Sequence, residues 1–282
     1  MTTAKQANRI PAAAAGRPVD PRLHAIVDRL LGDLHATVRD LEITELELRG
    51  ALRFLGEVGA AGEWQLLSDV LGISVAVDAN SHRPDAGGAT ASNVEGPFYR
   101  PDAPLVGPPV TLCGDDEPGE VLFVSGQVRS AGGEPLPVAL FDVWQTNENG
   151  LYEHEDPSQP EWNLRRRFHA GDDGRYEFRT VAPAAYQIPH SGPVGRFLEA
   201  VGRHPWRPAH LHLKLSAPGH RPLTTMLYLD GDPWLDDDTI FSVKPGLIVA
   251  LERHERPEEL RARGVDRPFS TASYDFTLEP AG

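Results

Sequence analysis

Two tyrosines and two histidines are the residues of this sequence best suited to chemistry. His210 and His212 stand at i and i+2, and Tyr186 and Tyr152 precede them along the chain. On an extended segment, side chains at i and i+2 point to the same face, so both imidazoles reach one ion. Phenolates are hard, anionic oxygen donors that suit ferric iron better than zinc or copper(I). These residues therefore predict an Fe(III) site.

The neighbours of these ligand candidates support a functional interpretation. Arg207 precedes His210 through Pro208 and Ala209, and the pair Ile188-Pro189 follows Tyr186. This order places a cation and an apolar wall beside the same ligands. Other histidines lack such neighbours and are interpreted as surface or loop residues: His24, His35, His82, His154, His169, His190, His204, His220 and His254.

The elements that must position the site are short strands. After a Gly- and Pro-rich stretch at 84–109, β-branched and aromatic runs alternate with turn residues. Many short strands without helical patterns between them predict a β-sandwich or barrel with long loops, interrupted by one short helix over 194–201. The expected strands are Val121–Arg129, Val138–Trp144, Arg175–Val181, His210–Leu215, Thr224–Leu229, Leu247–Leu251 and Tyr274–Leu278.

The N-terminal part has a different pattern. From Pro21 to about Asp78, apolar residues recur at helical spacing, which predicts helices whose apolar stripe packs in a core or against another subunit. Asp20 is a suitable N-cap before Pro21, and Thr44 with Glu47 fits a capping box. We therefore divide the chain into a disordered tail at 1–20, a helical segment at 21–83 and a β-sandwich domain at 84–282.

Composition limits the function classes. The formal net charge of −14, from 41 acidic and 27 basic side chains, argues against nucleic acid or an anionic membrane as partner. The single cysteine, Cys113, excludes an intrachain disulfide. No segment has the roughly 20 consecutive apolar residues that span a bilayer. These features predict a cytoplasmic enzyme that acts on a small molecule.

The sequence resembles the intradiol ring-cleaving dioxygenases, in the branch of the catechol and hydroxyquinol 1,2-dioxygenases. The resemblance extends from about Pro21 to the C-terminus. Its most specific stretches are LLSDVLGISVAVDA, ASNVEGPFYRPDAP, DVWQTNENGLYEHED, GRYEFRTVAPAAYQIP, GPVG and GRHPWRPAHLHLKL.

The resemblance implies one non-haem Fe(III) per subunit. It also implies that the enzyme uses O2 to cleave the ring of a small aromatic diol, which gives a cis,cis-muconate- or maleylacetate-type product. Tyr186 and His210 would be axial ligands, and Tyr152 and His212 equatorial ligands. Tyr186 would also accept a substrate proton. Arg207 would be the active-site arginine that stabilises negative charge on the ring. The N-terminal helices would form a homodimer, with a lipid as a candidate ligand at their interface.

The same resemblance points to a substrate pocket. Its apolar contacts would be Leu66, Val94, Phe98, Ile188 and Pro189. Asp69 aligns with a position that is acidic in the hydroxyquinol and chlorocatechol branches, and a carboxylate there accepts a hydrogen bond from a third ring hydroxyl. Hydroxyquinol is therefore the expected substrate. Met226 departs from the family, because that position usually carries Gln or His and a thioether donates no hydrogen bond.

Three alternatives stay open. Catechol or a chlorocatechol is the alternative substrate within the family, whereas a protocatechuate enzyme would not have such N-terminal helices. A cupin-type Fe(II) or Mn(II) oxygenase needs a carboxylate soon after its His-x-His, yet the first acidic residue after His212 is Asp230. A β-sandwich that only binds a ligand is the third alternative.

Overall fold

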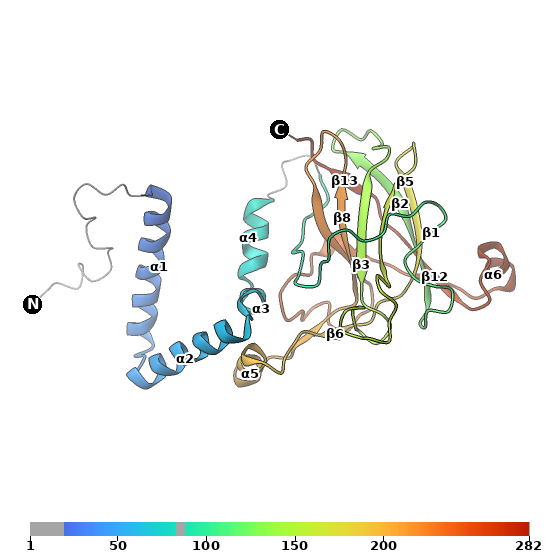
Figure 1. Ribbon diagram of the computed structural model, residues 1–282. Helices are drawn as coiled ribbons and strands as arrows, with labels where there is room; N and C mark the ends of the chain where they lie inside the picture. The colour runs from blue at the N-terminus through green and yellow to red at the C-terminus, as the bar shows by residue number, and fades with distance from the viewer. Residues whose placement is uncertain (1–19, 83–87, 282) are drawn as a thin grey trace, which may run out of the picture. The chain divides into compact units, whose positions relative to one another are not determined.

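Two layers of β-strands, joined by long loops, form the C-terminal part of the chain from Val110 onward, and in the described part of the chain four helices precede them (Figure 1). The computed structural model describes residues 20–82 and 88–281. The chain divides into two compact units between Ala60 and Ala61. The predicted tail at 1–20 lies outside the described residues except for Asp20, as do the residues next to the predicted boundary between 83 and 84. The predicted fold class, a β-sandwich with N-terminal helices, is confirmed.

The first unit consists of α1 (Pro21–Asp40) and nearly all of α2 (Glu45–Ala61). Both predicted caps are confirmed, because the Asp20 carboxylate accepts hydrogen bonds from two backbone N–H groups at the start of α1 and Thr44 and Glu47 bond reciprocally. The apolar stripe of these helices is not buried in a core. Its members remain largely exposed, among them Leu23, Leu30, Leu34 and Leu52.

The second unit contains the other helices and all strands. Glu63 precedes α3 (Trp64–Val70), and its carboxylate accepts a hydrogen bond of 2.9 Å from the Val194 N–H at the start of α5 (Pro193–Ala200). Arg203 donates to the Val70 carbonyl at 2.6 Å. These two contacts hold α3 against the segment around α5 from both ends. The remaining helices are α4 (Ile73–Ser81), the 3-10 helix η1 (Pro245–Leu247) and α6 (Pro257–Arg263).

The strands form two main sheets. One has the order β1-β5-β2-β12-β11, with β13 also paired to β2, and the other has the order β10-β9-β8-β3-β4. β6 and β7 form a separate two-stranded sheet. The strands are β1 (Val110–Thr111), β2 (Val121–Ser130), β3 (Leu140–Gln145), β4 (Arg165–His169), β5 (Arg175–Val181), β6 (Tyr186–Gln187), β7 (Trp206–Arg207), β8 (His210–Ser216), β9 (Leu223–Leu229), β10 (Ile248–Val249), β11 (Glu252–His254), β12 (Phe269–Ser273) and β13 (Phe276–Leu278).

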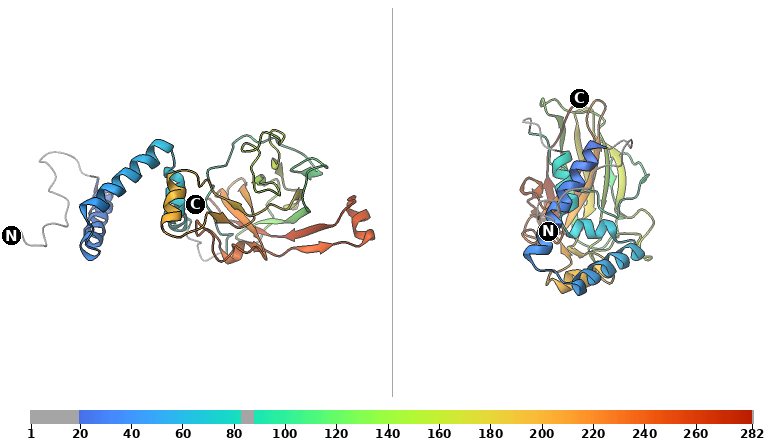
Figure 2. Two further views of the ribbon diagram at one scale, coloured as in Figure 1. Left: turned by 90° about the horizontal axis from the view of Figure 1, so that it is seen from below. Right: turned by 90° about the vertical axis from the view of Figure 1, so that its left-hand side faces the viewer.

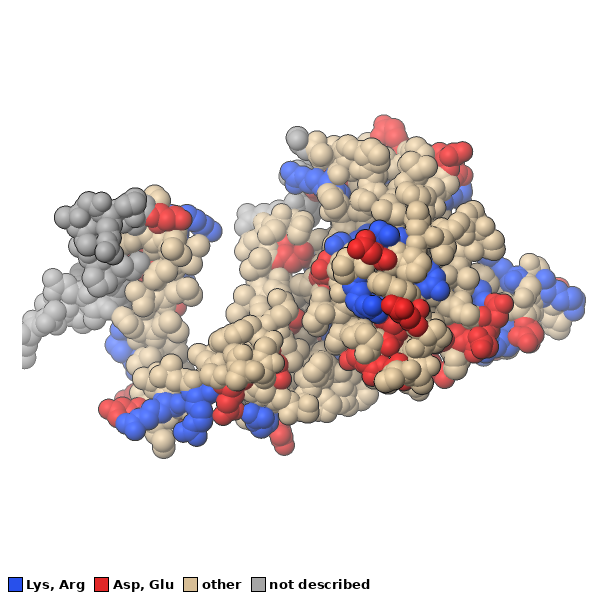
Figure 3. All heavy atoms as spheres, viewed as in Figure 1, with Lys and Arg blue, Asp and Glu red and all other residues tan. Residues whose placement is uncertain are grey.

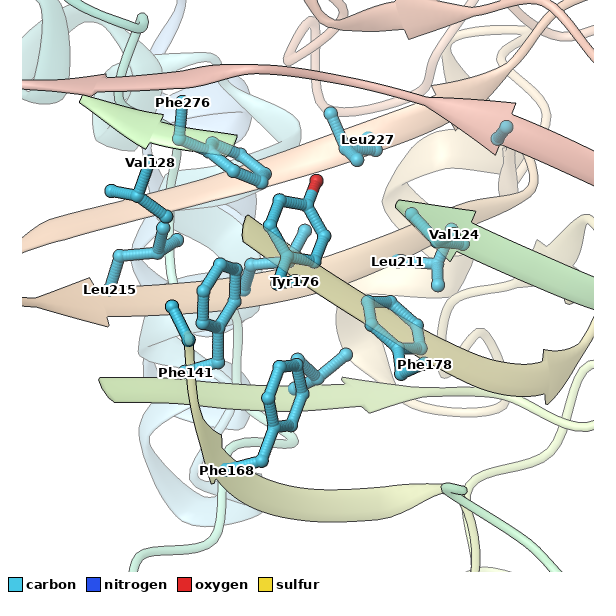
Figure 4. Packing of buried hydrophobic residues seen from close by; sticks show 14 of the residues in the cluster. Val124, Val128, Phe141, Phe168, Tyr176, Phe178, Leu211, Leu215, Leu227 and Phe276 are labelled. Carbon is cyan, nitrogen blue, oxygen red and sulfur yellow. The ribbon is translucent and has the colours of Figure 1, made fainter. Parts of the chain in front are cut away.

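The core lies between the two main sheets and is rich in aromatic rings (Figure 4). Phe141 of β3 stacks on Phe168 of β4, with ring centroids 4.9 Å apart. On the facing sheet, Tyr176 of β5 approaches Phe141 to 4.6 Å, and Phe276 of β13 lies edge-on to it. Alternating side chains from two sheets bury this apolar surface, as expected for a sandwich.

Several predicted bounds are wrong. The strand expected from Val138 begins at Leu140, because Val138 has a positive φ of 51° that no strand accommodates. The segment expected as Leu247–Leu251 is the end of η1 followed by the two-residue β10. The last strand begins at Phe276 rather than Tyr274. Unpredicted elements include β4, β12 and α6, and α6 lies at the opposite end of this unit from α5 (Figures 1 and 2).

The surface mixes charges of both signs. Figure 3 shows acidic and basic side chains of the described residues interspersed on the face it presents, without one continuous basic area there. None of the helices described is long and apolar enough to cross a lipid bilayer.

Candidate metal centre

The β8 strand presents His210 and His212 on one face, and both side chains are 2% exposed. Their Nε2 atoms lie 3.1 Å apart. The His210 Nδ1 faces the Pro208 carbonyl at 2.7 Å, and because a carbonyl only accepts, this nitrogen carries the proton. The Nε2 lone pair of His210 therefore points into the space shared with His212.

His212 is held by a ring contact. Trp144 lies directly opposite it in the β3–β8 register, and the two rings stack with centroids 4.7 Å apart and an interplanar angle of 7°. Within the described part of the chain, the His212 Nδ1 has no hydrogen-bond partner. The sequence analysis placed His212 on the same face as His210 but assigned no role to Trp144.

The two tyrosines close the other side of this space. Tyr186 is the first residue of β6, and Tyr152 lies in the loop after β3. Their rings are 5.8 Å apart at 84°, and they approach His210 and His212 to 5.6 Å and 6.4 Å respectively. Tyr152 is fully buried, yet among the described residues its hydroxyl has no hydrogen-bond partner. Unpaired buried polar atoms are rare and call for an explanation, such as an absent ion.

A glycine lets the Tyr152 loop approach β6. Gly150 has a φ of 77°, and a Cβ at this position would lie 2.9 Å from the Tyr186 Cβ and 3.1 Å from the Ala185 carbonyl oxygen. Any larger residue would therefore need both a strained backbone and a displaced β6. The two phenols converge because this position is glycine.

Burial sets the protonation of the four residues in the metal-free protein. It lowers the pKa of His210 to about 3 and, with the charge of Arg207 acting in the same direction, keeps this imidazole neutral. Burial likewise lowers the pKa of His212, and burial beside Tyr186 raises the pKa of Tyr152 well above its ordinary value. The imidazoles thus have free lone pairs at neutral pH, whereas a cation must displace the Tyr152 proton.

Arg207 lies beside this group, because β7 pairs with β6 in a register that sets it opposite Tyr186. Its Nη1 is 3.3 Å from the Tyr186 hydroxyl and 3.2 Å from the His210 Nε2. The guanidinium is 3% exposed and binds Asp238 through Nε at 3.2 Å and Ser242 through Nη2 at 2.7 Å. Although burial opposes its charge, Asp238 and the surrounding tyrosines hold the pKa of Arg207 well above its ordinary value.

Asp238 and Ser242 are residues that sequence reasoning missed. The Asp238 carboxylate accepts hydrogen bonds from the Ser242 backbone at 3.0 Å and its hydroxyl at 2.6 Å, in a loop after β9. The Ser242 hydroxyl also lies 2.8 Å from that of Tyr228, which accepts a hydrogen bond from Asn93. The only signal in the sequence was a carboxylate in the acidic run Asp236–Asp238, which is typical of a solvated loop.

Met226 fills the position where the resemblance leads one to expect a polar side chain. It is fully buried and lies opposite His212 in the β8–β9 register. Its Sδ accepts from the Arg207 Nη2 at 3.5 Å and from the Tyr228 hydroxyl at 3.1 Å. The thioether therefore serves as a weak acceptor for groups that donate toward it.

The predicted pocket residues lie in different surroundings. Phe98 is close to the phenols, with its ring 4.7 Å from that of Tyr152 and 6.4 Å from that of Tyr186. Val94 packs against the cluster of Met226 and Tyr228. Ile188 and Leu66 are buried, whereas Pro189 is exposed.

Asp69 is 3% exposed on α3 and accepts a hydrogen bond of 2.9 Å from the Gln65 side chain. Burial raises the pKa of this carboxyl, against hydrogen bonds from Ser74 and Gln65 and the positive charge of Arg207, which lower it.

The donor set distinguishes between the candidate metals. Over the residues that the structure describes, no group of three or more His, Cys, Asp or Glu side chains is arranged to hold a metal ion. A facial triad of two histidines and a carboxylate, which the cupin alternative requires, is therefore not formed there. The convergent donors are two imidazoles and two phenols, a set that suits a hard trivalent ion.

Comparison with known proteins identifies the family of the chain. A family model described as "Catechol dioxygenase N terminus" matches residues 20–89, and one described as "Dioxygenase" matches residues 94–280. The chain is 41% identical to a hydroxyquinol 1,2-dioxygenase of a Rhizobium species, over 92% of this chain and 90% of that protein. It is 38% identical to a catechol 1,2-dioxygenase of Acinetobacter baylyi, over 92% and 86%.

A solved structure is similar over the same range. The hydroxyquinol 1,2-dioxygenase of Pseudomonas putida superimposes with a TM-score of 0.86 at 40% identity, covering 94% of each chain.

Proposed function

The chain belongs to the family of intradiol ring-cleavage dioxygenases, and from this membership we propose that it opens hydroxyquinol between two hydroxyl-bearing carbons, using O2 and a ferric ion. The observation that carries the proposal is the convergence of Tyr152, Tyr186, His210 and His212 on one buried space. The unpartnered Tyr152 hydroxyl and the facing Nε2 atoms fit a metal ion bound among them. Ferric iron would supply a Lewis acid that binds the diol oxygens and prepares the ring for O2.

Tyr186 is the residue we assign to proton transfer. A diol must lose protons to bind as a chelating anion, and a phenolate oxygen inside the pocket is a suitable acceptor. The Arg207 Nη1, 3.3 Å from the Tyr186 oxygen, donates a hydrogen bond that orients this oxygen.

Arg207 has a second role toward the substrate. Its charge is fixed by Asp238 and Ser242 and shielded from water, so it stabilises negative charge on the ring more strongly than a solvated arginine would. Phe98 and Ile188 supply apolar surface that keeps water from the reacting atoms. Ring recognition by this pocket relies on flat apolar contacts.

Asp69 supports hydroxyquinol as the substrate. Its carboxylate is buried on α3 and accepts a hydrogen bond from the Gln65 amide. A third ring hydroxyl can donate to such a carboxylate, whereas catechol offers no third donor. The alternative is catechol or a chlorocatechol, which the similarity to a catechol 1,2-dioxygenase favours.

The α1 and α2 helices are the part we propose for dimerisation. Their exposed leucines form an apolar surface of a kind that soluble chains bury against a partner, and a second copy of the chain, with or without a lipid between the helices, would cover it. In this proposal α1 and α2 of the segment 21–83 serve dimerisation, whereas α3 and α4 belong to the compact unit that contains the strands. The catalytic part is 84–282 together with Leu66 and Asp69 of α3.

Metal analysis, visible absorption and O2 uptake test the proposal together. We expect iron in the purified protein, a visible band from tyrosinate-to-Fe(III) charge transfer, and a higher kcat/KM for hydroxyquinol than for catechol or 4-chlorocatechol. A Tyr186→Phe variant should lose part of the band and slow turnover. Protein without iron, or without O2 uptake on all three diols, would support the alternative of a binding module. A tenfold preference for catechol would reject hydroxyquinol alone.

A further inference from the structure

A second buried arginine lies behind the candidate metal centre. Arg165 begins β4 and its side chain is 1% exposed, with the guanidinium carbon 5.4 Å from the centroid of the Tyr152 ring. Its Nε donates to the Glu153 carboxylate, and its Nη2 lies 3.4 Å from the His154 Nδ1. The third nitrogen, Nη1, is buried and has no hydrogen-bond partner among the described residues.

The charge around Arg165 is not balanced. Glu153 is 2% exposed and is shared between Arg165 and Arg100, so two cations meet one buried carboxylate. Two other acidic side chains lie nearby and are exposed to solvent: Glu161, 3.8 Å from Arg100, and Glu155, whose carboxylate accepts a hydrogen bond of 3.1 Å from the Tyr152 N–H. A buried charge is costly unless an opposite charge accompanies it. The surplus positive charge therefore favours an anion in the adjoining space, where the Tyr152 phenol lies.

The two sides of the site repeat one arrangement. Arg207 is buried beside Tyr186 and anchored by the buried Asp238, and Arg165 is buried beside Tyr152 and anchored by the buried Glu153. Each phenol thus lies beside a buried arginine that a buried carboxylate anchors, although Glu153 also binds Arg100. Arg207 lies within hydrogen-bond distance of Tyr186 and His210, whereas the contact of Arg165 with the site is to the Tyr152 ring, so we expect Arg165 to act mainly through Tyr152.

We propose that Arg165 is a positioning residue that stabilises Tyr152 as the anionic oxygen donor to the metal, and so sets the energy of the electrons that this phenolate gives to iron. This inference rests on the proposed function, because it presupposes a ferric ion at the four ligands. Arg165 lies on the phenol side of the site, and its field falls with distance. It therefore stabilises the phenolate electrons more than it stabilises an added electron on the metal.

This difference predicts the direction of a spectral shift. Charge transfer moves an electron from the phenolate to iron, so a cation near the phenolate raises the transition energy. Removing the charge in Arg165→Gln should move the visible band to longer wavelength. Removing the opposing charge in Glu153→Gln should move it to shorter wavelength. Arg165→Lys keeps a positive charge on a different side chain, so its band should lie close to the wild-type wavelength.

The experiment compares the visible spectra and iron contents of wild type and these three variants, after circular dichroism has shown which of them fold. Unchanged band positions in Arg165→Gln and Glu153→Gln, or shifts in the same direction, would overturn the inference. If Arg165→Gln does not fold, Glu153→Gln decides alone through the sign of its shift. Wild-type protein without iron and without a band would instead contradict the proposed function.

A Tyr186→Phe background separates the two phenols. There the residual band comes from Tyr152, and we expect Glu153→Gln to shift it as far as in the wild-type background. A shift present only when Tyr186 is intact would show that the effect does not act through Tyr152, and would reject the inference.

Discussion

Trp144 lies face to face with His212, with an angle of 7° between the rings, while His210 is held by a hydrogen bond from Nδ1 to the Pro208 carbonyl. The two neighbouring imidazoles on β8 are thus oriented by different means. A histidine that ligates a metal usually donates its second N–H to an acceptor, which fixes its ring. For His212, the flat indole takes over that function.

Replacing Trp144 with Leu should therefore weaken metal retention. Without the stacked ring, the His212 imidazole is free to rotate, and an aromatic pair contributes about 0.5–1.5 kcal/mol beyond its buried area. We expect iron to be lost to a competing chelator roughly three- to tenfold more readily, as measured by the decay of the visible band. Trp144→Phe keeps a stacked ring and should lie between the two. Equal iron retention in all three proteins would show that the stack does not position His212.

Asp238→Asn should impair catalysis by Arg207. The amide keeps the shape of the carboxylate but removes the charge that compensates a buried guanidinium, and breaking such a pair costs about 3–5 kcal/mol when one charge is left alone. We expect lower thermal stability and a fall in kcat/KM of about 10- to 100-fold. The adjacent Asp237 is the matched control, because it is 79% exposed and pairs with His204 at the surface. Asp237→Asn should leave both quantities close to wild type, and equal losses in the two variants would contradict the prediction.

The metal-free protein should lose stability as the pH falls below the ordinary histidine range. The folded pKa of His210 is about 3, below the value of about 6.5 in the unfolded chain, so the unfolded state binds more protons between these values. The stabilising contribution is complete above about pH 6.5 and declines toward pH 3, by on the order of 1 kcal/mol per pH unit. Urea unfolding of the apo-protein at pH 7, 6 and 5 measures this slope.

A histidine substitution provides the control for that slope. His210→Asn removes one of two buried titrating rings and should reduce the slope to the part that His212 contributes, whereas the exposed His24 of α1, changed to Gln, should leave it as it is. A slope that survives His210→Asn unchanged would assign the acid sensitivity to other groups.

Iron binding to the apo-protein should release protons. Burial beside Tyr186 raises the pKa of Tyr152, so this phenol is protonated in the apo-protein at neutral pH and must lose its proton to bind a metal. The apparent affinity for iron should therefore increase as the pH rises from 6 to 8, and proton release on metal binding can be followed with a pH indicator. An affinity that is flat over this range would argue against phenolate ligation.

Asp69→Asn should change substrate preference. The neutral amide still fits the pocket but accepts a hydrogen bond less strongly than a carboxylate does. We expect kcat/KM for hydroxyquinol to fall by roughly tenfold, which corresponds to about 1.4 kcal/mol, while the value for catechol changes little because catechol lacks the third hydroxyl. Catechol is thus the internal control, and an equal fall for both diols would point to a structural role of Asp69 in α3.

The local patterns in the sequence predicted local structure well. The caps at Asp20 and Thr44, the strand carrying His210 and His212, and the short helix near Val194 are set by neighbours within a few residues. The predictions failed where pairing between strands that are distant in sequence determines the secondary structure. The β4 strand begins with three arginines and shows no alternation of apolar and polar residues, yet it pairs with β3 over its whole length.

By itself, the sequence determined which residue types are available: a pair of imidazoles with fixed spacing on one strand, phenols that suit a hard cation, and enough apolar strands for a sandwich. Only the tertiary structure decided which distant residues stand behind them, because charge compensation acts through space and leaves no periodicity in the chain. Asp238 joins Arg207 from a loop after β9, and Arg165 joins Tyr152 from β4. Burial of these groups excludes the water that would otherwise screen their charges, and the sequence does not record that exclusion.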